Sequence, residues 1–120
     1  MDFIRYAKSK GYEVTAVYIV TSDPKINIAR IKQRVVRGGH DVPEDKVISR
    51  YEKSMRLMFP VLEEAHDAAV YDNSGIVPQI IFTKDKVEVY ACFSEHRQQP
   101  WIQKYLLSPA KEAGVEIRLC

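Results

Sequence analysis

The sequence lacks long apolar runs and clustered cysteines, and each absence bears on a class of protein. No run of 18 apolar residues occurs among the 120 residues, so a membrane-spanning helix is excluded. The start of the chain has neither the apolar segment nor the small-residue cleavage site of a signal peptide, so we expect a cytoplasmic protein. The two cysteines, Cys92 and Cys120, form no CxxC pair and no cluster with histidine, so neither a disulfide framework nor a zinc site is expected.

The composition is typical of a single globular domain. Apolar residues make up 46% of the chain and charged residues 28%, and the formal net charge is +2. No repeat, low-complexity tract or linker-like stretch divides the sequence. We therefore expect residues 1–120 to form one domain, with Cys92 in its core.

The small net charge of the whole chain is the sum of a basic central segment and an acidic remainder. Residues 24–56 contain nine Lys and Arg residues against four Asp and Glu residues, which gives this segment a net charge of +5. The rest of the chain carries a net charge of −3. A concentrated positive region of this kind indicates an anionic partner.

The N-terminal third predicts a helix, a strand and a second helix. The apolar positions of residues 2–10 share one helical face, and the glycine that follows ends that helix. Residues 12–20 are rich in β-branched and aromatic side chains, which favours a strand covered on both faces in a parallel sheet. Ser22 or Asp23 then caps a helix over residues 24–37, with proline in its first turn.

Basic side chains recur at helical spacing on two neighbouring helices. The stripes consist of Arg30, Arg34 and Arg37 on the first helix and of Lys46, Arg50 and Lys53 on the second. A Gly-Gly pair separates the two helices, and the second begins near Pro43. Like charges at these spacings destabilise a helix by about 0.2–0.5 kcal/mol per pair, so we expect a bound anion to offset the repulsion.

The second helix also carries an apolar stripe that we expect in the core. The stripe consists of Val47, Tyr51, Met55 and Met58. Pro60 should kink or end this helix, because proline lacks an N–H and its ring clashes with the preceding turn.

The C-terminal half alternates predicted strands with one helix. Strands are expected at residues 68–71, 78–82, 86–93 and 115–119, and a helix at residues 100–107. The segment Thr83-Lys84-Asp85 joins the second and third of these strands, which favours a β-hairpin. Together the elements predict an α/β fold with a mainly parallel sheet, flanking helices and a C-terminal hairpin.

Three spaced motifs resemble those of zeta-toxin-like P-loop kinases. Members of that family commonly read Arg-x-x-x-Arg-Val-x-x-Gly-Gly-His-x-Val-Pro, which this chain carries at residues 30–43. The Ile-Ser-Arg-Tyr segment at residues 48–51 and the Tyr-Asp-Asn-Ser segment at residues 71–74 follow in the family's order. The resemblance covers about residues 3–82 and implies the C-terminal half of such a kinase, with the lid at about residues 24–58.

The resemblance implies transfer of the ATP γ-phosphate to a hydroxyl with Mg²⁺, and some members act on sugar-nucleotide cell-wall precursors. It assigns phosphoryl-stabilising, catalytic roles to Arg34, Arg37 and Arg50 and nucleotide contacts to Arg30, His40 and Asn73. The GxxxxGK[ST] loop that cradles ATP phosphates does not occur among the five glycines of this chain. We therefore expect a partial P-loop kinase-like fold that is inactive as a kinase alone.

The same residues admit other interpretations, which the sequence leaves open. The basic stripes also fit a solvated helix face, or a non-catalytic domain that binds nucleotide or another phosphate. Nucleic acid is disfavoured, because Tyr51 is the one aromatic near the stripes and no helix-turn-helix, RNP or zinc-finger pattern occurs. His40 also suits a helix end, and Asn73 also suits a turn. An incomplete sheet would leave an edge for a separate N-terminal half or a second copy.

Overall fold

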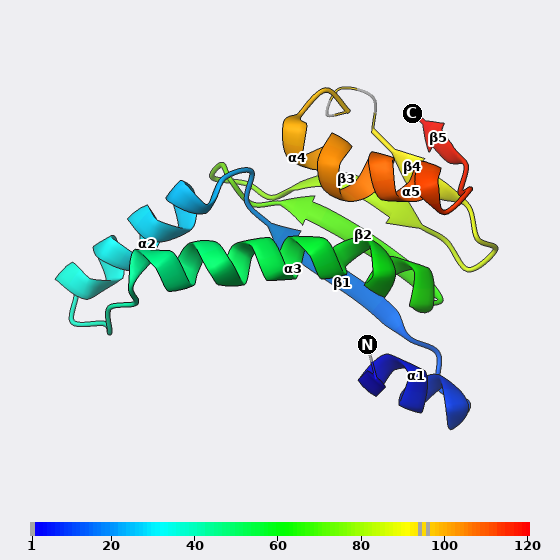
Figure 1. The fold of residues 1–120 in the computed structure, drawn as a ribbon, viewed down its shortest axis with the longest axis horizontal. Coiled ribbons are helices and arrows are strands. Elements are labelled where there is room, and N and C mark those ends of the chain that lie inside the picture. Colours follow the sequence, from blue (N-terminus) through cyan, green and yellow to red (C-terminus); the bar gives the residue numbers. More distant parts are fainter. Residues whose placement is uncertain (1, 94, 96) are drawn as a thin grey trace.

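A mixed five-stranded sheet organises the fold (Figure 1). The computed structural model describes residues 2–93, 95 and 97–120. The strands are β1 (Thr15–Val20), β2 (Asp67–Asp72), β3 (Gln79–Lys84), β4 (Tyr90–Cys92) and β5 (Ile117–Leu119), and they lie side by side in that order. The α/β class predicted from the sequence is confirmed.

The sheet is not mainly parallel, which corrects the prediction. β1 pairs with β2 and β4 pairs with β5 in parallel, whereas β2 and β3, and β3 and β4, are antiparallel. A parallel pair needs a long crossover, whereas an antiparallel pair can be joined by a short turn. The segment at residues 73–78 is too short for a helical crossover, so the chain reverses direction after β2. The predicted hairpin is present as β3 and β4.

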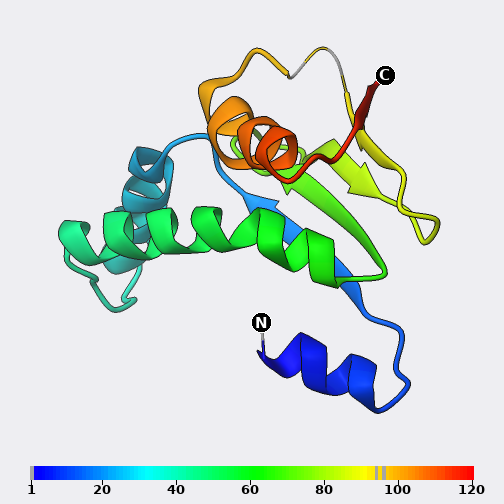
Figure 2. The ribbon, with the colours of Figure 1, turned by 45° about the vertical axis from the view of Figure 1, so that its right-hand side comes forward.

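The helices that build the core lie on one face of the sheet. The helical elements are α1 (Asp2–Ser9), α2 (Pro24–Val36), α3 (Glu44–Glu64) and a last segment made of α4 (Pro100–Ile102), a π-helical turn (Gln103–Leu107) and α5 (Ser108–Glu112). Both views show α3 and the last segment across the same face, while α2 and the loop after it extend beyond the sheet (Figures 1 and 2). No helix in the described part of the chain is long and apolar enough to cross a membrane.

The core lies between this helical layer and the sheet. Its side chains exposed by 2% or less include Met55, Met58, Phe59 and Leu62 from α3 and Val70, Phe82 and Cys92 from the strands. Burying one such side chain contributes about 1.5–3 kcal/mol. The core positions predicted for Met55, Met58 and Cys92 are therefore confirmed, and Tyr51 packs half-buried against the same cluster.

α3 passes through Pro60 and continues to Glu64 as one helix. Proline inside a helix costs about 3 kcal/mol, because it removes one backbone hydrogen bond and crowds the preceding turn. Phe59 and Leu62, on either side of Pro60, are both buried against the sheet. Their packing holds the last turn of α3 in place despite the proline.

β1 is an edge strand with one exposed face, whereas the sequence predicted cover on both faces. Val20 is buried on the helical side, but Val17 and Ile19 on the other face are 59% and 64% exposed. The β-branched composition of this segment favours an extended backbone. It carries no information on whether another layer lies over the outer face.

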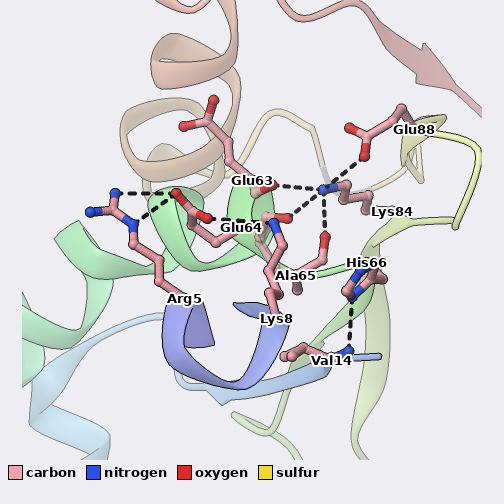
Figure 3. A network of polar contacts seen from close by, with 10 residues as sticks. Arg5, Lys8, Val14, Glu63, Glu64, Ala65, His66, Lys84 and Glu88 are labelled. Atoms are coloured by element: carbon pink, nitrogen blue, oxygen red, sulfur yellow. Dashed lines mark hydrogen bonds and ion pairs between the residues drawn. The ribbon is translucent and has the colours of Figure 1, made fainter. Parts of the chain in front are cut away.

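Lys84 places a buried charge at the end of β3, where the sequence predicted a turn. The three acceptors of its Nζ atom are the backbone carbonyls of Leu62 at 2.9 Å, Glu63 at 2.9 Å and Ala65 at 2.6 Å (Figure 3). Carbonyls at the C-terminal end of a helix have no partner within the helix, and the negative end of the helix dipole favours a cation. The hairpin connection therefore lies at residues 85–89.

α1 is attached to the same end of α3 by ion pairs. The Arg5 guanidinium lies 3.1 Å from the Glu64 carboxylate, and Lys8 Nζ lies 3.6 Å from it (Figure 3). The hydrogen bond from Arg5 holds the pKa of Glu64 below its ordinary value. No described residue of α1 is buried. Polar contacts, and little apolar packing, therefore position this helix.

Candidate functional site

A pocket of about 400 Å³ opens where β1 gives way to α2. Its apolar wall includes Val20, Ile31, Val47 and Met55, and its polar lining includes Arg30, Arg34, Arg50 and Asn73. Open α/β sheets bind ligands beyond the carboxyl ends of parallel strands, and small-molecule pockets have volumes of this order. The pocket is therefore the candidate functional site.

The local sequence explains why the chain turns at this point. Asp23 is the N-cap of α2, and its carboxylate accepts a hydrogen bond of 2.8 Å from the Lys25 backbone N–H. Pro24 occupies the first turn, where its missing N–H costs nothing. The Asn73 backbone N–H donates to the Val20 carbonyl at 2.7 Å, which extends the contact between the ends of β1 and β2. Of the two predicted caps, Asp23 is the one observed.

Arg30 joins α2 to the segment after β2. Its Nη2 atom donates to the backbone carbonyl of Asn73 at 2.7 Å and lies 3.4 Å from that of Ser74. The guanidinium is half-buried and lines the pocket. These bonds use one terminal nitrogen of a group with five N–H donors. Arg30 therefore fixes the pocket wall and still contributes positive charge to the cavity.

Arg34 and Arg50 bring two further cations to the pocket from neighbouring helices. Both side chains are exposed and line the cavity, Arg34 from α2 and Arg50 from α3. Within residues 2–93, 95 and 97–120, no carboxylate lies within ion-pair distance of either guanidinium. Their donors are thus available to a ligand.

Arg37 and His40 lie outside the pocket lining. α2 ends at Val36, and Arg37 is its C-cap with a backbone conformation that leaves the helix. The stripe of basic residues predicted on one continuous helix therefore stops after Arg34. His40 is exposed in the loop between α2 and α3. The structure places four of the six predicted site residues together: Arg30, Arg34, Arg50 and Asn73.

Three polar residues at the floor of the pocket were not among the predicted site residues. Thr21 Oγ1 donates to the Asn27 side-chain oxygen, and the Tyr51 hydroxyl donates to the Thr21 carbonyl at 2.7 Å. Burial is the main cause that raises the pKa of Tyr51 to about 12. The position of Thr21, directly after a strand and before a helix cap, was the signal available in the sequence. Tyr51 was assigned to the core because it shares the spacing of Met55.

A network of hydroxyl groups and one carboxylate lies beside the pocket. The Ser74 hydroxyl donates to the buried Asp72 carboxylate, which also accepts the Ser74 backbone N–H at 2.9 Å. The Ser22 backbone N–H donates to Ser74 Oγ at 2.8 Å. This network ties the end of β1 to the end of β2. The Asp72 carboxylate therefore accepts hydrogen bonds from within the protein, and the cationic side chains determine the charge of the pocket.

The residues present fit a phosphate group better than a metal ion. Guanidinium groups match phosphate oxygens with paired hydrogen bonds and keep their charge. In the described part of the chain, no group of three or more His, Cys, Asp or Glu side chains could hold a metal ion. The arginine side chains that line the pocket are therefore suited to a phosphate group, and no metal site follows from the described side chains.

Comparisons with known proteins give one partial similarity. A 48-residue stretch is 46% identical to an uncharacterized protein of Haemophilus influenzae, which corresponds to 40% of this chain and 34% of that protein. The match thus spans about a third of the length of its relative. No protein-family profile and no solved structure matches the chain.

Proposed function

We propose that the pocket binds the phosphate groups of a nucleotide, and that the chain is the lid-bearing part of a zeta-toxin-like, ATP-dependent small-molecule kinase. The observation that supports this most is the position of Arg34 and Arg50. They reach one pocket from two helices, without an ion-pair partner among the described residues. Two unpaired cations at one cavity favour a ligand with at least two negative charges.

The apolar wall of the pocket argues for an organic phosphate over a free inorganic ion. Val20 and Met55 are buried, and Ile31 adds a half-buried aliphatic side chain. A cavity of about 400 Å³ has room for more than a phosphate group. Its apolar lining favours a ligand that also carries an apolar or aromatic group. A nucleoside polyphosphate combines both properties.

In this proposal the chain binds the nucleotide but does not transfer phosphate alone. Phosphoryl transfer requires a phosphate-cradling loop and bound metal in addition to lid cations. The sequence carries no GxxxxGK[ST] loop, so these parts would come from a separate N-terminal half. Arg34 and Arg50 would then stabilise the transferring phosphoryl group.

Isothermal titration of the chain with ATP at low ionic strength tests the binding site. Arg34→Ala and Arg50→Ala are each expected to weaken the affinity about tenfold, which is a loss of about 1.4 kcal/mol. Arg37→Ala is the matched control, because it removes the same charge from the same region outside the pocket lining. Equal losses for all three variants would show nonspecific attraction and would overturn the assignment of the pocket.

A second measurement separates binding from catalysis. ATP turnover with Mg²⁺ is expected to be undetectable for the isolated chain. Turnover that Arg34→Ala or Arg50→Ala abolishes would show that this expectation is wrong. Binding of ATP that remains unproductive when a separate N-terminal half is supplied would favour the alternative, a non-catalytic nucleotide-binding domain.

A further inference from the structure

Neutral polar side chains line the end of the pocket nearest the carboxyl ends of β1 and β2. Thr21 and Asn27 belong to this lining, and the Tyr51 hydroxyl donates to the Thr21 carbonyl at 2.7 Å. Asn73 reaches the same end from the segment after β2, because its backbone N–H donates to the Val20 carbonyl at 2.7 Å. The pocket therefore has a neutral polar end in addition to its arginines.

The lining that α2 contributes changes from neutral to cationic along one helical face. Asn27, Arg30 and Arg34 follow one another at spacings of three and four residues, so they share that face. Asn27 and Arg34 are about 10 Å apart along the helix axis. Because α2 begins beside β1 and extends beyond the sheet (Figures 1 and 2), Asn27 lies at the sheet end and Arg34 lies farther out. A ligand that contacts both residues has a phosphate at one end and a neutral group at the other.

Asn27 carries unused hydrogen-bond donors at this neutral end. Its side-chain oxygen accepts a hydrogen bond from the Thr21 hydroxyl, which fixes the orientation of the carboxamide. In the described part of the chain, no group accepts a hydrogen bond from its amide nitrogen. An amide nitrogen has two N–H donors. Asn27 therefore offers donors to an acceptor atom of a bound ligand.

Asn73 adds a second carboxamide to the same end of the pocket. Its backbone is held on both sides, because its N–H donates to Val20 and its carbonyl accepts from Arg30 Nη2 at 2.7 Å. Its side chain has no hydrogen-bond partner among the residues that the structure describes. The carboxamide of Asn73 is thus free to contact a ligand from a fixed backbone.

We propose that Asn27 binds the base of the nucleotide whose phosphates Arg34 and Arg50 bind. The inference rests on the function proposed above and adds the residue that recognises the neutral part of the ligand. Nucleobases present ring-nitrogen and carbonyl acceptors, and carboxamides pair with such edges. Ile31 and Met55 line the same pocket and supply apolar surface for the faces of a ring. A base thus satisfies the neutral polar groups without bringing a further charge to the pocket.

Titration with ATP and with inorganic triphosphate tests the inference. Asn27→Ala removes the donors, while the Thr21 hydroxyl keeps the Asp23 carbonyl, at 3.3 Å, as an acceptor. This variant is expected to weaken ATP binding about tenfold and to leave the affinity for triphosphate unchanged within about twofold. Gln33→Ala is the matched control and should change neither affinity, because it removes an exposed carboxamide of α2 outside the pocket lining. Circular dichroism checks that each variant is folded.

The ratio of the two affinities separates the base contact from the phosphate site. Arg34→Ala is expected to weaken ATP and triphosphate to a similar extent. Equal losses for the two ligands in Asn27→Ala, or no loss for ATP, would overturn the base contact and leave the phosphate site intact. An unmodified chain that binds neither ligand would instead overturn the proposed function, and this inference with it.

AMP and ribose 5-phosphate separate the base from the sugar, because AMP carries a base that ribose 5-phosphate lacks. Asn27→Ala is expected to weaken AMP binding about tenfold and to leave the affinity for ribose 5-phosphate unchanged. The shifts of backbone amide NMR signals during titration measure both affinities. Equal losses for AMP and ribose 5-phosphate would place Asn27 at the sugar and would overturn the proposal.

Discussion

Two sets of cations in this molecule are positioned in opposite ways. Lys84 is buried, and three backbone carbonyls at the C-terminal end of α3 surround its ammonium group, with the Glu88 carboxylate at 3.5 Å. Arg34 and Arg50 are exposed and have no carboxylate partner in the described part of the chain. Removing a buried charge leaves the carbonyls that it satisfied without a donor and destabilises the fold, whereas a charge with free donors is available for a ligand. The difference predicts separate consequences for stability and for binding.

The largest effect is expected at Lys84. Lys84→Met keeps much of the side-chain volume but leaves the carbonyls at the end of α3 without their donor, which is expected to cost about 3 kcal/mol. Chemical denaturation of the variant measures this loss. Lys86→Met is the matched control, since Lys86 is an exposed lysine two residues away. If both variants lose the same stability, the buried contacts of Lys84 are not what holds the helix end.

Arg30 should show an intermediate effect, because it serves both purposes. Arg30→Ala removes its bonds to the carbonyls of Asn73 and Ser74 and is expected to destabilise the fold by about 1.5 kcal/mol. It should also weaken ATP binding. Arg34→Ala, one helical turn away, is expected to weaken binding without loss of stability. Chemical denaturation and titration with ATP should be carried out on both variants. An Arg30→Ala variant that loses affinity for ATP but no stability would contradict the account.

Tyr51 links the floor of the pocket to the fold. Tyr51→Phe removes the hydroxyl that binds the Thr21 carbonyl and is expected to cost about 1 kcal/mol. Because burial raises the pKa of Tyr51 from 10.0 to about 12, the unfolded chain loses this proton first as the pH rises. Stability should therefore fall between about pH 10 and pH 12. Denaturation across that range should show a shallower decline for Tyr51→Phe than for the unmodified chain, and parallel declines would contradict this assignment.

The smallest effects on stability are expected at the free cations. Arg34→Ala and Arg50→Ala should change the free energy of unfolding by less than about 0.5 kcal/mol. Added pyrophosphate should raise the melting temperature of the unmodified chain and raise it less for either variant, since a ligand stabilises the state that binds it. If Arg34→Ala or Arg50→Ala lost as much stability as Lys84→Met, the two sets of cations would not differ in their contribution to the fold.

Local features of the fold could be predicted from the sequence. A helix cap at Ser22 or Asp23, the start of α2 at Pro24 and the core positions of Met55 and Met58 all follow from neighbouring residues. Lys84 could not be predicted, because the acceptors that hold its charge lie about twenty residues earlier in the chain. The exposed face of β1 could not be predicted either, because strand propensity does not specify which distant segments cover a sheet.

The candidate site was predictable as a set of arginines but not as a pocket. Helical spacing grouped Arg30, Arg34 and Arg37, yet α2 ends before Arg37 and leaves it outside the lining. Bringing Arg50 next to Arg34 depends on how α3 packs back along α2. Thr21 and Asn27 enter the site through a hydrogen bond to each other, and neither residue belongs to a recognisable motif.

The most direct test of the contrast between the cation sets is NMR titration of the side-chain N–H signals with ATP at low ionic strength. The account predicts saturable shifts at Arg34 and Arg50, a smaller shift at Arg30, and no shift at Arg37. The ammonium signal of Lys84 should stay in place. Shifts at Arg37, Lys46 and Lys53 as large as those at Arg34 and Arg50, without saturation, would contradict the account.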